Sequence, residues 1–287
     1  MFRALIRPVS SLNIPNSLIR KNSSLVTYEV VEGVAKVVLN NPKALNALTV
    51  EMGDAFGDVM EEVNQHAVNG DVKVAVLTGA AHAFSAGGDL KWLHERTLAT
   101  PIENEKTMIK FYSRFLFPLR KLPVPTIAAI NGPAVGAGMC ISLACDMRVA
   151  AHNAKIGFTF VNLGLHPGMG CTHYLPKIAG IETASRLLFS GEIIHGDEAL
   201  RLGVVGEVTD DYDGCIELAM KRAKLISHAG PISVQSNLIS LRRSVDEGLE
   251  RALQREASAQ ALCYATSDFA EGLDAIKTKR KPEFSGF

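Results

Sequence analysis

The glycine-rich segment Asn131–Cys140, with the sequence NGPAVGAGMC, constrains this chain most strongly. It lies between an apolar run at 124–130, typical of a buried strand, and an apolar run at 141–144, typical of a buried helix. Gly136 and Gly138 have no Cβ, so a ligand can approach the main chain closely there. The first N–H groups of a helix have no partner inside the helix and carry partial positive charge. The segment predicts either a tightly packed strand-to-helix turn or a site for an oxygen atom bearing negative charge.

A second segment has the same organisation. Val74–Gly79 is an apolar strand that ends in glycine, and the small-residue turn of Ala83–Leu90 follows it, with a helix expected to begin near Asp89. Two such turns can each donate one N–H group to the same carbonyl oxygen. Such a pair is an oxyanion hole, which stabilises charge developing on a thioester oxygen.

The order and spacing of several motifs resemble those of the crotonase superfamily, the enoyl-CoA hydratase/isomerase family. The motifs are Asn41–Leu48, Phe84–Leu90, Pro125–Gly132, Gly136–Gly138, Cys145–Ala150, Gly164–Gly168, Gly191 and Lys279–Phe284. The resemblance runs from about residue 26 to the C-terminus. It implies an α/β (α+β) fold in which repeated strand-strand-helix turns form a spiral, with a C-terminal helical region that supports trimerisation. Homotrimers or dimers of trimers are therefore expected.

The resemblance also implies the site residues. By position in the motifs, the two oxyanion-hole N–H groups belong to Gly88 and Ala137. A CoA thioester is expected to contact residues in the same loops and at the C-terminal end: Lys43, Ala44, Leu45, Ala86, Gly87, Asp89, Leu90, Gly136, Phe160, Pro167, Gly168 and Lys279. A helix cap is the alternative role for Asp89, and a solvated helix end is the alternative for Lys279.

The acid–base residues depart from the family pattern. Family hydratases carry glutamates at the positions that are Cys140 and Phe160 here. Water addition needs groups that deliver a proton and activate water, and a phenyl ring does neither. Cys140 could act if the helix start favoured its thiolate, but the favoured interpretation is a small core residue, because a buried thiol is usually inert. His166 has a suitable pKa for proton transfer, and its alternative role is in the loop structure.

Three functions remain open on these observations. The first is hydration or isomerisation of an enoyl-CoA with atypical acid and base residues. The second is another reaction of the superfamily, such as decarboxylation, which forms the enolate directly. The third is a catalytically silent protein that binds CoA thioesters or acts as a scaffold. No tightly bound cofactor is expected, because coenzyme A is part of the substrate.

Composition argues against several other classes. The chain has 30 basic and 30 acidic residues and no formal net charge, so neither nucleic acid nor an anionic membrane is an expected partner. All apolar runs are too short to span a membrane. The five cysteines show no C-x-x-C pattern, and Cys171 and His173 lack a third ligand, so no disulfide framework or metal site is expected.

Charge and periodicity suggest three regions: 1–24, 25–212 and 213–287. Residues 1–24 contain four basic residues, five serines and no acid, a pattern typical of a mitochondrial transit peptide or, alternatively, of a disordered tail. A matrix location is therefore expected. Residues 25–212 should form the spiral core with the CoA-thioester site, and 213–287 the helical C-terminal region.

Hydrophobic periodicity predicts the main elements. A strand pair is expected at 26–31 and 34–39, a helix capped by Thr49 up to about Ala67, and a loop over the site at 94–104. A long helical pattern from Ile232 to Ala265 is expected to break near Asp246. Strands are also expected at 71–78, 124–130, 147–151 and 155–158, and helices at 109–121, 172–178, 183–189, 197–202, 213–227 and 267–279.

Overall fold

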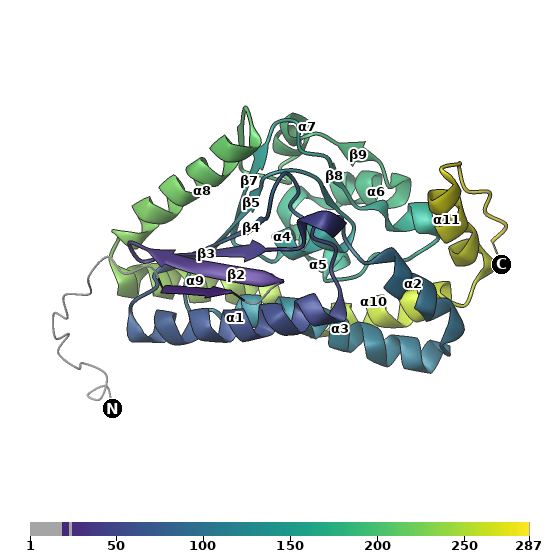
Figure 1. Ribbon diagram of the computed structural model, residues 1–287, viewed down its shortest axis with the longest axis horizontal. Coiled ribbons are helices and arrows are strands. Elements are labelled where there is room, and N and C mark those ends of the chain that lie inside the picture. The colour runs from purple at the N-terminus through teal and green to yellow at the C-terminus, as the bar shows by residue number, and fades with distance from the viewer. Residues whose placement is uncertain (1–18, 23–24, 287) are drawn as a thin grey trace.

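The computed structural model describes residues 19–22 and 25–286. A seven-stranded sheet in the order β1-β2-β3-β4-β5-β7-β10 runs through the centre of the molecule (Figure 1). β1, β2 and β3 pair antiparallel, and the strands from β3 onward pair parallel. The strands are β1 (Ile19–Asn22), β2 (Val26–Val31), β3 (Val34–Leu39), β4 (Val74–Gly79), β5 (Thr126–Ile130), β7 (Met147–Ala151) and β10 (Glu207–Thr209).

The parallel strands are buried because helices cover both faces of the sheet. Every residue of β4 and β5 is buried. Figure 1 shows α1 (Val50–Asn69) and α3 (Pro101–Lys121) on one side and α8 (Tyr212–Ser227) on the other. Phe56 of α1 meets Phe115 of α3 with ring centroids 5.6 Å apart, so the two helices share one apolar layer.

A smaller sheet, in the order β6-β8-β9, lies beyond the ends of the central strands. It consists of β6 (Ala134–Val135), β8 (Ile156–Gly157) and β9 (Ile193–Ile194). The remaining short helices are η1 (Pro42–Ala44), α2 (Leu90–Glu95), η2 (Arg96–Leu98), α4 (Ala137–Leu143), η3 (Thr159–Leu163), α5 (Cys171–Ala179), α6 (Ile181–Ser190) and α7 (Gly196–Arg201), of which α4 packs against β6.

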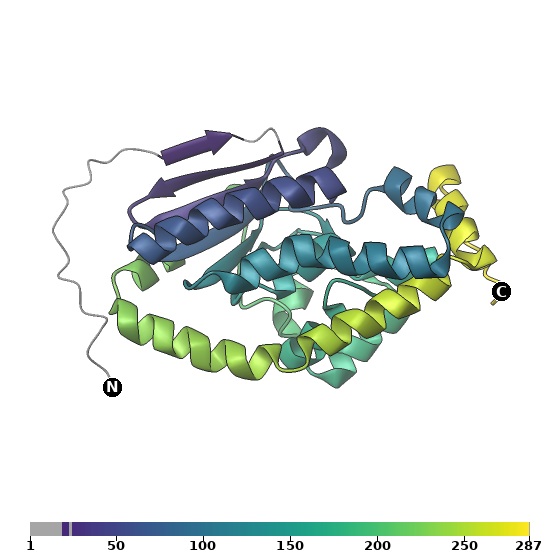
Figure 2. The ribbon, with the colours of Figure 1, turned by 90° about the horizontal axis from the view of Figure 1, so that it is seen from below.

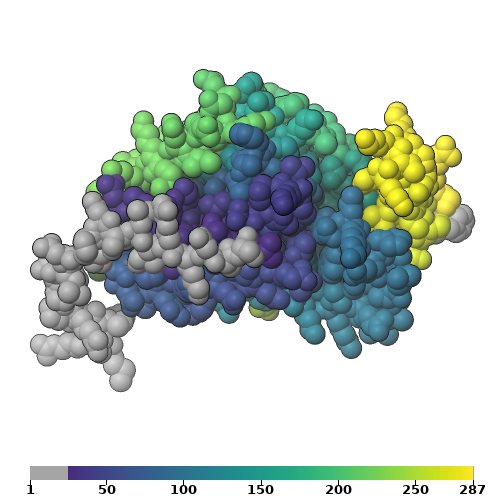
Figure 3. Space-filling model, viewed as in Figure 1, coloured from purple at the N-terminus to yellow at the C-terminus, as the bar shows by residue number. Residues whose placement is uncertain are grey.

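Two long C-terminal helices lie end to end across the molecule. Figure 2 shows that α9 (Pro231–Asp246) meets α10 (Leu249–Cys263) at a bend, and α10 packs along α3. α11 (Ser267–Thr278) then packs against η3 and α2. In Figure 3 this segment, in yellow, forms one end of the molecule next to the α2–α3 segment. α10 and α11 therefore cover the same side as the short helices near β6.

A buried ion network fixes the junction of α9 and α10 to the sheet. Asp146, just before β7, accepts hydrogen bonds from Arg242 Nη2 of α9 at 2.6 Å and from the Thr126 backbone N–H at 2.8 Å. Arg120 of α3 donates through Nη2 to Asp246 Oδ2 at the end of α9, at 2.9 Å. Because these charges pair with one another in a mostly buried place, the start of α10 is held against α3.

Several element predictions are confirmed. The strand pair β2–β3 and the helix after Thr49 are present, and the Thr49 side chain caps α1. α9 ends at Asp246, where the break was expected, and α10 begins at Leu249. The helices of the last region are likewise present.

Two predictions need correction. The loop expected at 94–104 is wrong, because α2, η2 and the first turn of α3 occupy most of it. A capping box of Thr100 with Glu103, and Pro101 in the first turn, begin α3 there. Residues 1–24 were expected to be a transit peptide or a disordered tail, but 19–22 form β1, which pairs antiparallel with β2. This pairing satisfies backbone groups that an edge strand would otherwise leave open. The other residues of 1–24 lie outside the described part.

No described helix combines the length and the apolar character that crossing a bilayer requires. Within residues 19–22 and 25–286, no group of three or more His, Cys, Asp or Glu side chains is arranged to hold a metal ion.

Candidate active site

Two turns at the ends of β4 and β6 meet, as the glycine motifs predict. Ser85 forms an isolated parallel bridge with Ala134, and the Val135 N–H donates to the Ser85 carbonyl at 3.1 Å. Gly87 has φ +87°, and a Cβ there would lie 2.6 Å from the Val135 carbonyl oxygen and 3.4 Å from the Ala137 nitrogen. Glycine is therefore required at 87, both for its backbone conformation and for the close approach of the second turn.

The N–H groups of Gly88 and Ala137 have no acceptor among the residues that the structure describes. Both residues line the same cavity. Backbone N–H groups away from bulk water almost always have a partner, so two unpaired ones beside a cavity indicate a site for an oxygen atom. The geometry thus brings together the two residues predicted to form the oxyanion hole.

Buried amide side chains hold the first turn. Asn46 donates from Nδ2 to the carbonyls of Ala80 and Ala83, at 3.0 and 2.8 Å. Asn131 donates from Nδ2 to the Gly79 carbonyl at 2.8 Å. Both asparagines are completely buried. Asn46 belongs to a motif associated with CoA contact, yet its side chain serves the neighbouring turn, a role that sequence reasoning missed.

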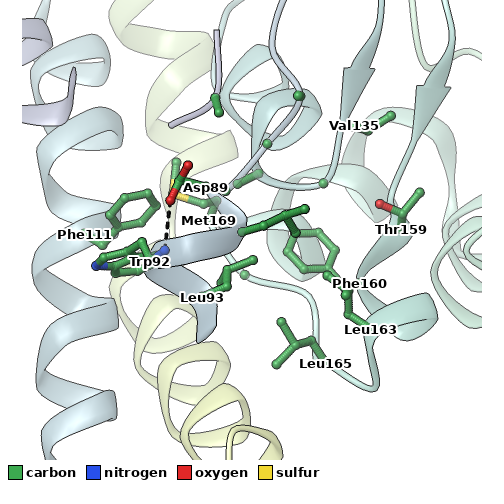
Figure 4. A pocket seen from close by; sticks show the side chains of 18 of the residues that line it. Asp89, Trp92, Leu93, Phe111, Val135, Thr159, Phe160, Leu163, Leu165 and Met169 are labelled. Carbon is green, nitrogen blue, oxygen red and sulfur yellow. Dashed lines mark hydrogen bonds between the residues drawn. The ribbon is translucent and has the colours of Figure 1, made fainter. Parts of the chain in front are cut away.

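The cavity has a volume of about 400 Å³ and a largely apolar wall. Figure 4 shows Phe160, Leu163 and Leu165 on one side and Phe111 with Trp92 on the other. Of the predicted site residues, those that line it are Ala44, Ala86, Gly87, Gly88, Asp89, Leu90, Gly136, Ala137, Phe160 and Gly168. Those that do not are Lys43, Leu45, Cys140, His166, Pro167 and Lys279.

Asp89 has the capping role that was its alternative. Its Oδ1 accepts a hydrogen bond from the Trp92 N–H at 2.8 Å, drawn as the dashed line in Figure 4. Among the described residues it is the only charged side chain in the cavity wall. Because Asp89 caps the first turn of α2, its carboxylate has a structural role.

The structure does not bring Cys140 to the cavity. Its side chain is completely buried and lies against Cys171, whose pKa is raised well above the ordinary thiol value by burial and by this contact. A thiol enclosed in this way behaves as a small core residue. Phe160 does reach the cavity and presents only its ring.

His166 also lies outside the cavity wall. Its Nδ1–H donates to the Pro167 carbonyl at 2.6 Å. Burial lowers the pKa of His166, although this hydrogen bond favours the charged form. The imidazole is therefore tied to its own loop, as in its alternative role, and is neutral near pH 7.

Sequence reasoning missed the polar side chains that do line the cavity. Tyr112 comes from α3, Gln260 comes from α10, and Tyr264 directly follows α10. Thr159, beside Gly136, also lines the cavity. Tyr112 lies in the helix predicted at 109–121 and Gln260 in the helical pattern predicted at 232–265, and neither residue belongs to a motif. No sequence signal joins residues 148 positions apart, so the pairing required the structure.

A family model and known proteins match nearly the whole chain. The family model for enoyl-CoA hydratase/isomerase matches residues 29–286. The chain is 33% identical to a crotonyl-CoA hydratase of Syntrophomonas wolfei over 260 residues, 90% of this chain and 97% of that protein. It is 36% identical to an (E)-benzylidenesuccinyl-CoA hydratase of Thauera aromatica over 265 residues, 91% of this chain and 99% of that protein.

Solved structures have the same fold. A crystal structure of an enoyl-CoA hydratase from Mycobacterium avium subsp. paratuberculosis superposes with a TM-score of 0.79 at 27% identity, covering 92% of this chain and all of that one. The expected crotonase-like fold is confirmed, with parallel strands whose ends carry the two glycine turns. With a family match over nearly the whole chain and relatives above 30% identity, the protein belongs to the enoyl-CoA hydratase/isomerase family of the crotonase superfamily.

Proposed function

We propose that this protein polarises the carbonyl of an acyl-CoA thioester between the N–H groups of Gly88 and Ala137 and stabilises the enolate that forms there. The observation that carries the proposal is the pair of unpaired N–H groups beside one cavity. Each such donor is commonly worth about 3 kcal/mol of transition-state stabilisation, because it is already oriented before charge develops.

The favoured reaction is hydration or isomerisation of an enoyl-CoA with atypical acid and base residues. In hydration, water loses one proton as its oxygen bonds to the β carbon, the double-bond electrons pass into the thioester enolate, and a proton is then delivered to the α carbon, so that one water is added overall. The relatives named as hydratases support this class. Because positions 140 and 160 carry no carboxylate, hydration is expected to be slow.

Decarboxylation is a second candidate, favoured by the apolar wall of the cavity. Loss of CO2 breaks a carbon–carbon bond and leaves its electron pair on the α carbon, so the enolate forms without a protein base. Apart from the capping Asp89, the described wall contains no carboxylate that would repel the substrate's own. An apolar surrounding also disfavours the charged carboxylate and so favours its loss.

The CoA part of the ligand is proposed to bind at the loop around η1. The Ala86 carbonyl accepts no hydrogen bond from the described residues. The Ala86 N–H donates a hydrogen bond to the Leu45 carbonyl at 2.9 Å. Ala86 is thus available for an adenine amine, while exposed Lys43 and Lys279 are available for phosphates. Ile276 of α11 lines the cavity, which supports a contact between the C-terminal helix and the same ligand.

The proposed protein is a homo-oligomer of the mitochondrial matrix. A homotrimer or dimer of trimers is supported by exposed apolar side chains on α9, where Ile232, Ile239 and Leu241 are 81%, 61% and 69% exposed. Light scattering would show three or six copies of 30.9 kDa, before any leader is removed. A mitochondrial matrix location is supported by the composition of residues 1–24, and import of a reporter fused to them would test it.

The central experiment is a mass-spectrometric screen of the purified protein against enoyl-, malonyl- and hydroxyacyl-CoA thioesters. Gain of water, movement of a double bond, or loss of CO2 identifies the reaction. Calorimetry with acetyl-CoA and crotonyl-CoA should show micromolar binding, about 8 kcal/mol. Binding without turnover would indicate a silent binder, and absence of binding would contradict the proposal.

A further inference from the structure

The loop before α5 contains a residue in a strained backbone conformation. Met169 has φ +60°, in the left-handed region, although it is not a glycine, and Gly170 follows it with φ +73°. A residue with a Cβ rarely adopts this conformation, and it does so only where the surrounding structure holds it there. A glycine at 169 would be free of this strain. The methionine side chain is therefore expected to have a role that offsets the cost.

The carboxyl group of Glu256, on α10, holds the backbone beside Met169. Its Oε2 accepts from the Gly170 N–H at 2.7 Å, and its Oε1 accepts from the N–H and the hydroxyl of Thr172 at 2.8 and 2.6 Å. Gly170 is the N-cap of α5 and supplies no side-chain cap, so the completely buried Glu256 caps α5 from another helix. These bonds fix the chain directly after Met169 and so the direction of its side chain.

Met169 lies at the inner end of the cavity. The exposed lining residues are Ala44, Leu90 and Ile276, which places the mouth beside them. Met169 and Phe111 also line the cavity, as Figure 4 shows, but they are only 1% and 2% exposed. A ligand that enters at the mouth therefore reaches these two side chains last. Because both are apolar, the part of the ligand that meets them is expected to be an apolar chain end.

We propose that Met169 closes the inner end of the cavity and sets the longest acyl chain that binds, and that Glu256 is the residue that positions it. Each methylene of the chain gains affinity by burial until the chain reaches Met169, and further methylenes find no space. This assignment rests on the proposed function, because it requires the acyl part of a CoA thioester to enter the cavity.

The test measures binding of a series of saturated acyl-CoA thioesters, from acetyl-CoA to decanoyl-CoA, by calorimetry on the full-length protein. These ligands have no double bond, so they are neither hydrated nor isomerised during the measurement. In the wild type, affinity should rise about fourfold for each added methylene, the gain from burying it. Affinity should then stop rising at one chain length, which is the limit set by the inner end of the cavity.

A matched pair of variants at position 169 shows whether this side chain sets the limit. Met169→Ala removes the side chain beyond Cβ and leaves a space, so the limit should move outward by about two methylenes. Met169→Leu is the control, because it keeps the bulk of the side chain and the same backbone strain, and its limit should stay where it is in the wild type. A loss of folded protein would lower binding of all chain lengths alike and would not move the limit.

Glu256→Gln tests the positioning role. An amide NH2 replaces one accepting oxygen and faces an N–H donor, so the loop cannot keep both attachments. The limit should move to longer chains, whereas acetyl-CoA, the shortest ligand, should keep its dissociation constant within about twofold. Thr172→Val, which removes only the hydroxyl bond, is a milder variant and should move the limit in the same direction. Glu250→Gln is the control, because Glu250 is an exposed acid on the same helix.

The outcomes are distinct. A limit that stays in place in Met169→Ala, or that moves equally in Met169→Leu, overturns the assignment to Met169. An unchanged limit in both Glu256→Gln and Thr172→Val overturns the positioning role of Glu256. A wild type whose affinity rises steadily up to decanoyl-CoA overturns this inference and leaves the proposed function standing. Failure of every acyl-CoA to bind overturns both.

Discussion

The two sides of the cavity are held in different ways. The turns that present Gly88 and Ala137 are joined largely by backbone hydrogen bonds, such as Val135 N–H to Ser85 O at 3.1 Å and Leu48 N–H to Gly87 O at 2.7 Å. The opposite loop, Leu165–Thr172, is held by side chains from α10. Gln260 bonds to the His166 carbonyl, and Glu256 accepts from the N–H groups of Gly170 and Thr172 at 2.7 and 2.8 Å.

This difference separates two kinds of chemistry. Backbone bonds do not depend on the identity of most side chains, so the unpaired N–H groups of Gly88 and Ala137 lie beside the cavity although positions 140 and 160 carry no carboxylate. Proton transfer and recognition of the acyl chain depend on side chains. A single substitution can therefore change either of them. A chain of this family can therefore retain thioester polarisation while its reaction or its acyl specificity changes.

The largest expected effect on activity comes from removing one of the two backbone N–H donors beside the cavity. Ala137→Pro removes one oxyanion N–H while keeping a residue that the first turn of a helix tolerates. We expect kcat to fall about 10²- to 10³-fold on whichever thioester the protein turns over. Steady-state kinetics measures this, and Ala137→Ser, which keeps the N–H, is the control. Equal activity of the two variants would show that Ala137 is not part of the hole.

The second prediction adds a side-chain function to the intact backbone site. Phe160→Glu places a carboxylate in the cavity wall, and hydration of crotonyl-CoA should rise about 10²-fold, the low end for a general acid or base. The same change at Cys140 is less suitable, because that side chain is buried against Cys171. Phe160→Gln is the control, since an amide cannot take the proton. The interpretation fails if Glu and Gln give the same rate.

The backbone turns could be predicted from the sequence, whereas the side-chain contacts between distant helices could not. Gly87 and Gly138 mark the two turns because close backbone approach leaves few other choices: a Cβ would lie 2.6 Å from the Val135 carbonyl oxygen at the first and 2.6 Å from the Ser85 carbonyl oxygen at the second. The capping box of Thr100 and Glu103 was also readable, and missing it produced the wrong loop at 94–104. By contrast, nothing local in the sequence pairs Tyr112 with Gln260, or Glu256 with Gly170. These contacts depend on how α10 lies along α3, which only the folded chain determines.

The third prediction concerns the loop held by side chains. Burial raises the pKa of Glu256 to about 7 from 4.5, although its hydrogen bonds from Thr172 and Gly170 favour the anion. Between these two values the folded state binds more protons than the unfolded state, so stability from this group falls as pH rises. The full difference corresponds to about 3 kcal/mol.

Denaturant unfolding of the wild type and of Glu256→Gln from pH 4.5 to 8 measures this effect. The pKa values of His166 and His173 are lowered mainly by burial, so these histidines oppose the trend, and both remain in the variant. The difference between the two curves therefore isolates Glu256. We expect the wild type to lose its advantage across the window. Parallel curves would mean that Glu256 is ionised throughout.

The smallest effect is expected at Cys140, where the comparison is sharpest. Its position in the motif is that of a family glutamate, yet its thiol is enclosed beside Cys171 and does not line the cavity. Cys140→Ala should leave kcat within about twofold, because a buried thiol of this kind is inert. Loss of the sulfur creates a small cavity and costs about 1 kcal/mol, or roughly 3 °C in melting temperature. Kinetics and thermal unfolding of the same preparation measure both. A loss of activity of tenfold or more without loss of fold would contradict this expectation. It would indicate that the Cys140 thiol takes part in proton transfer.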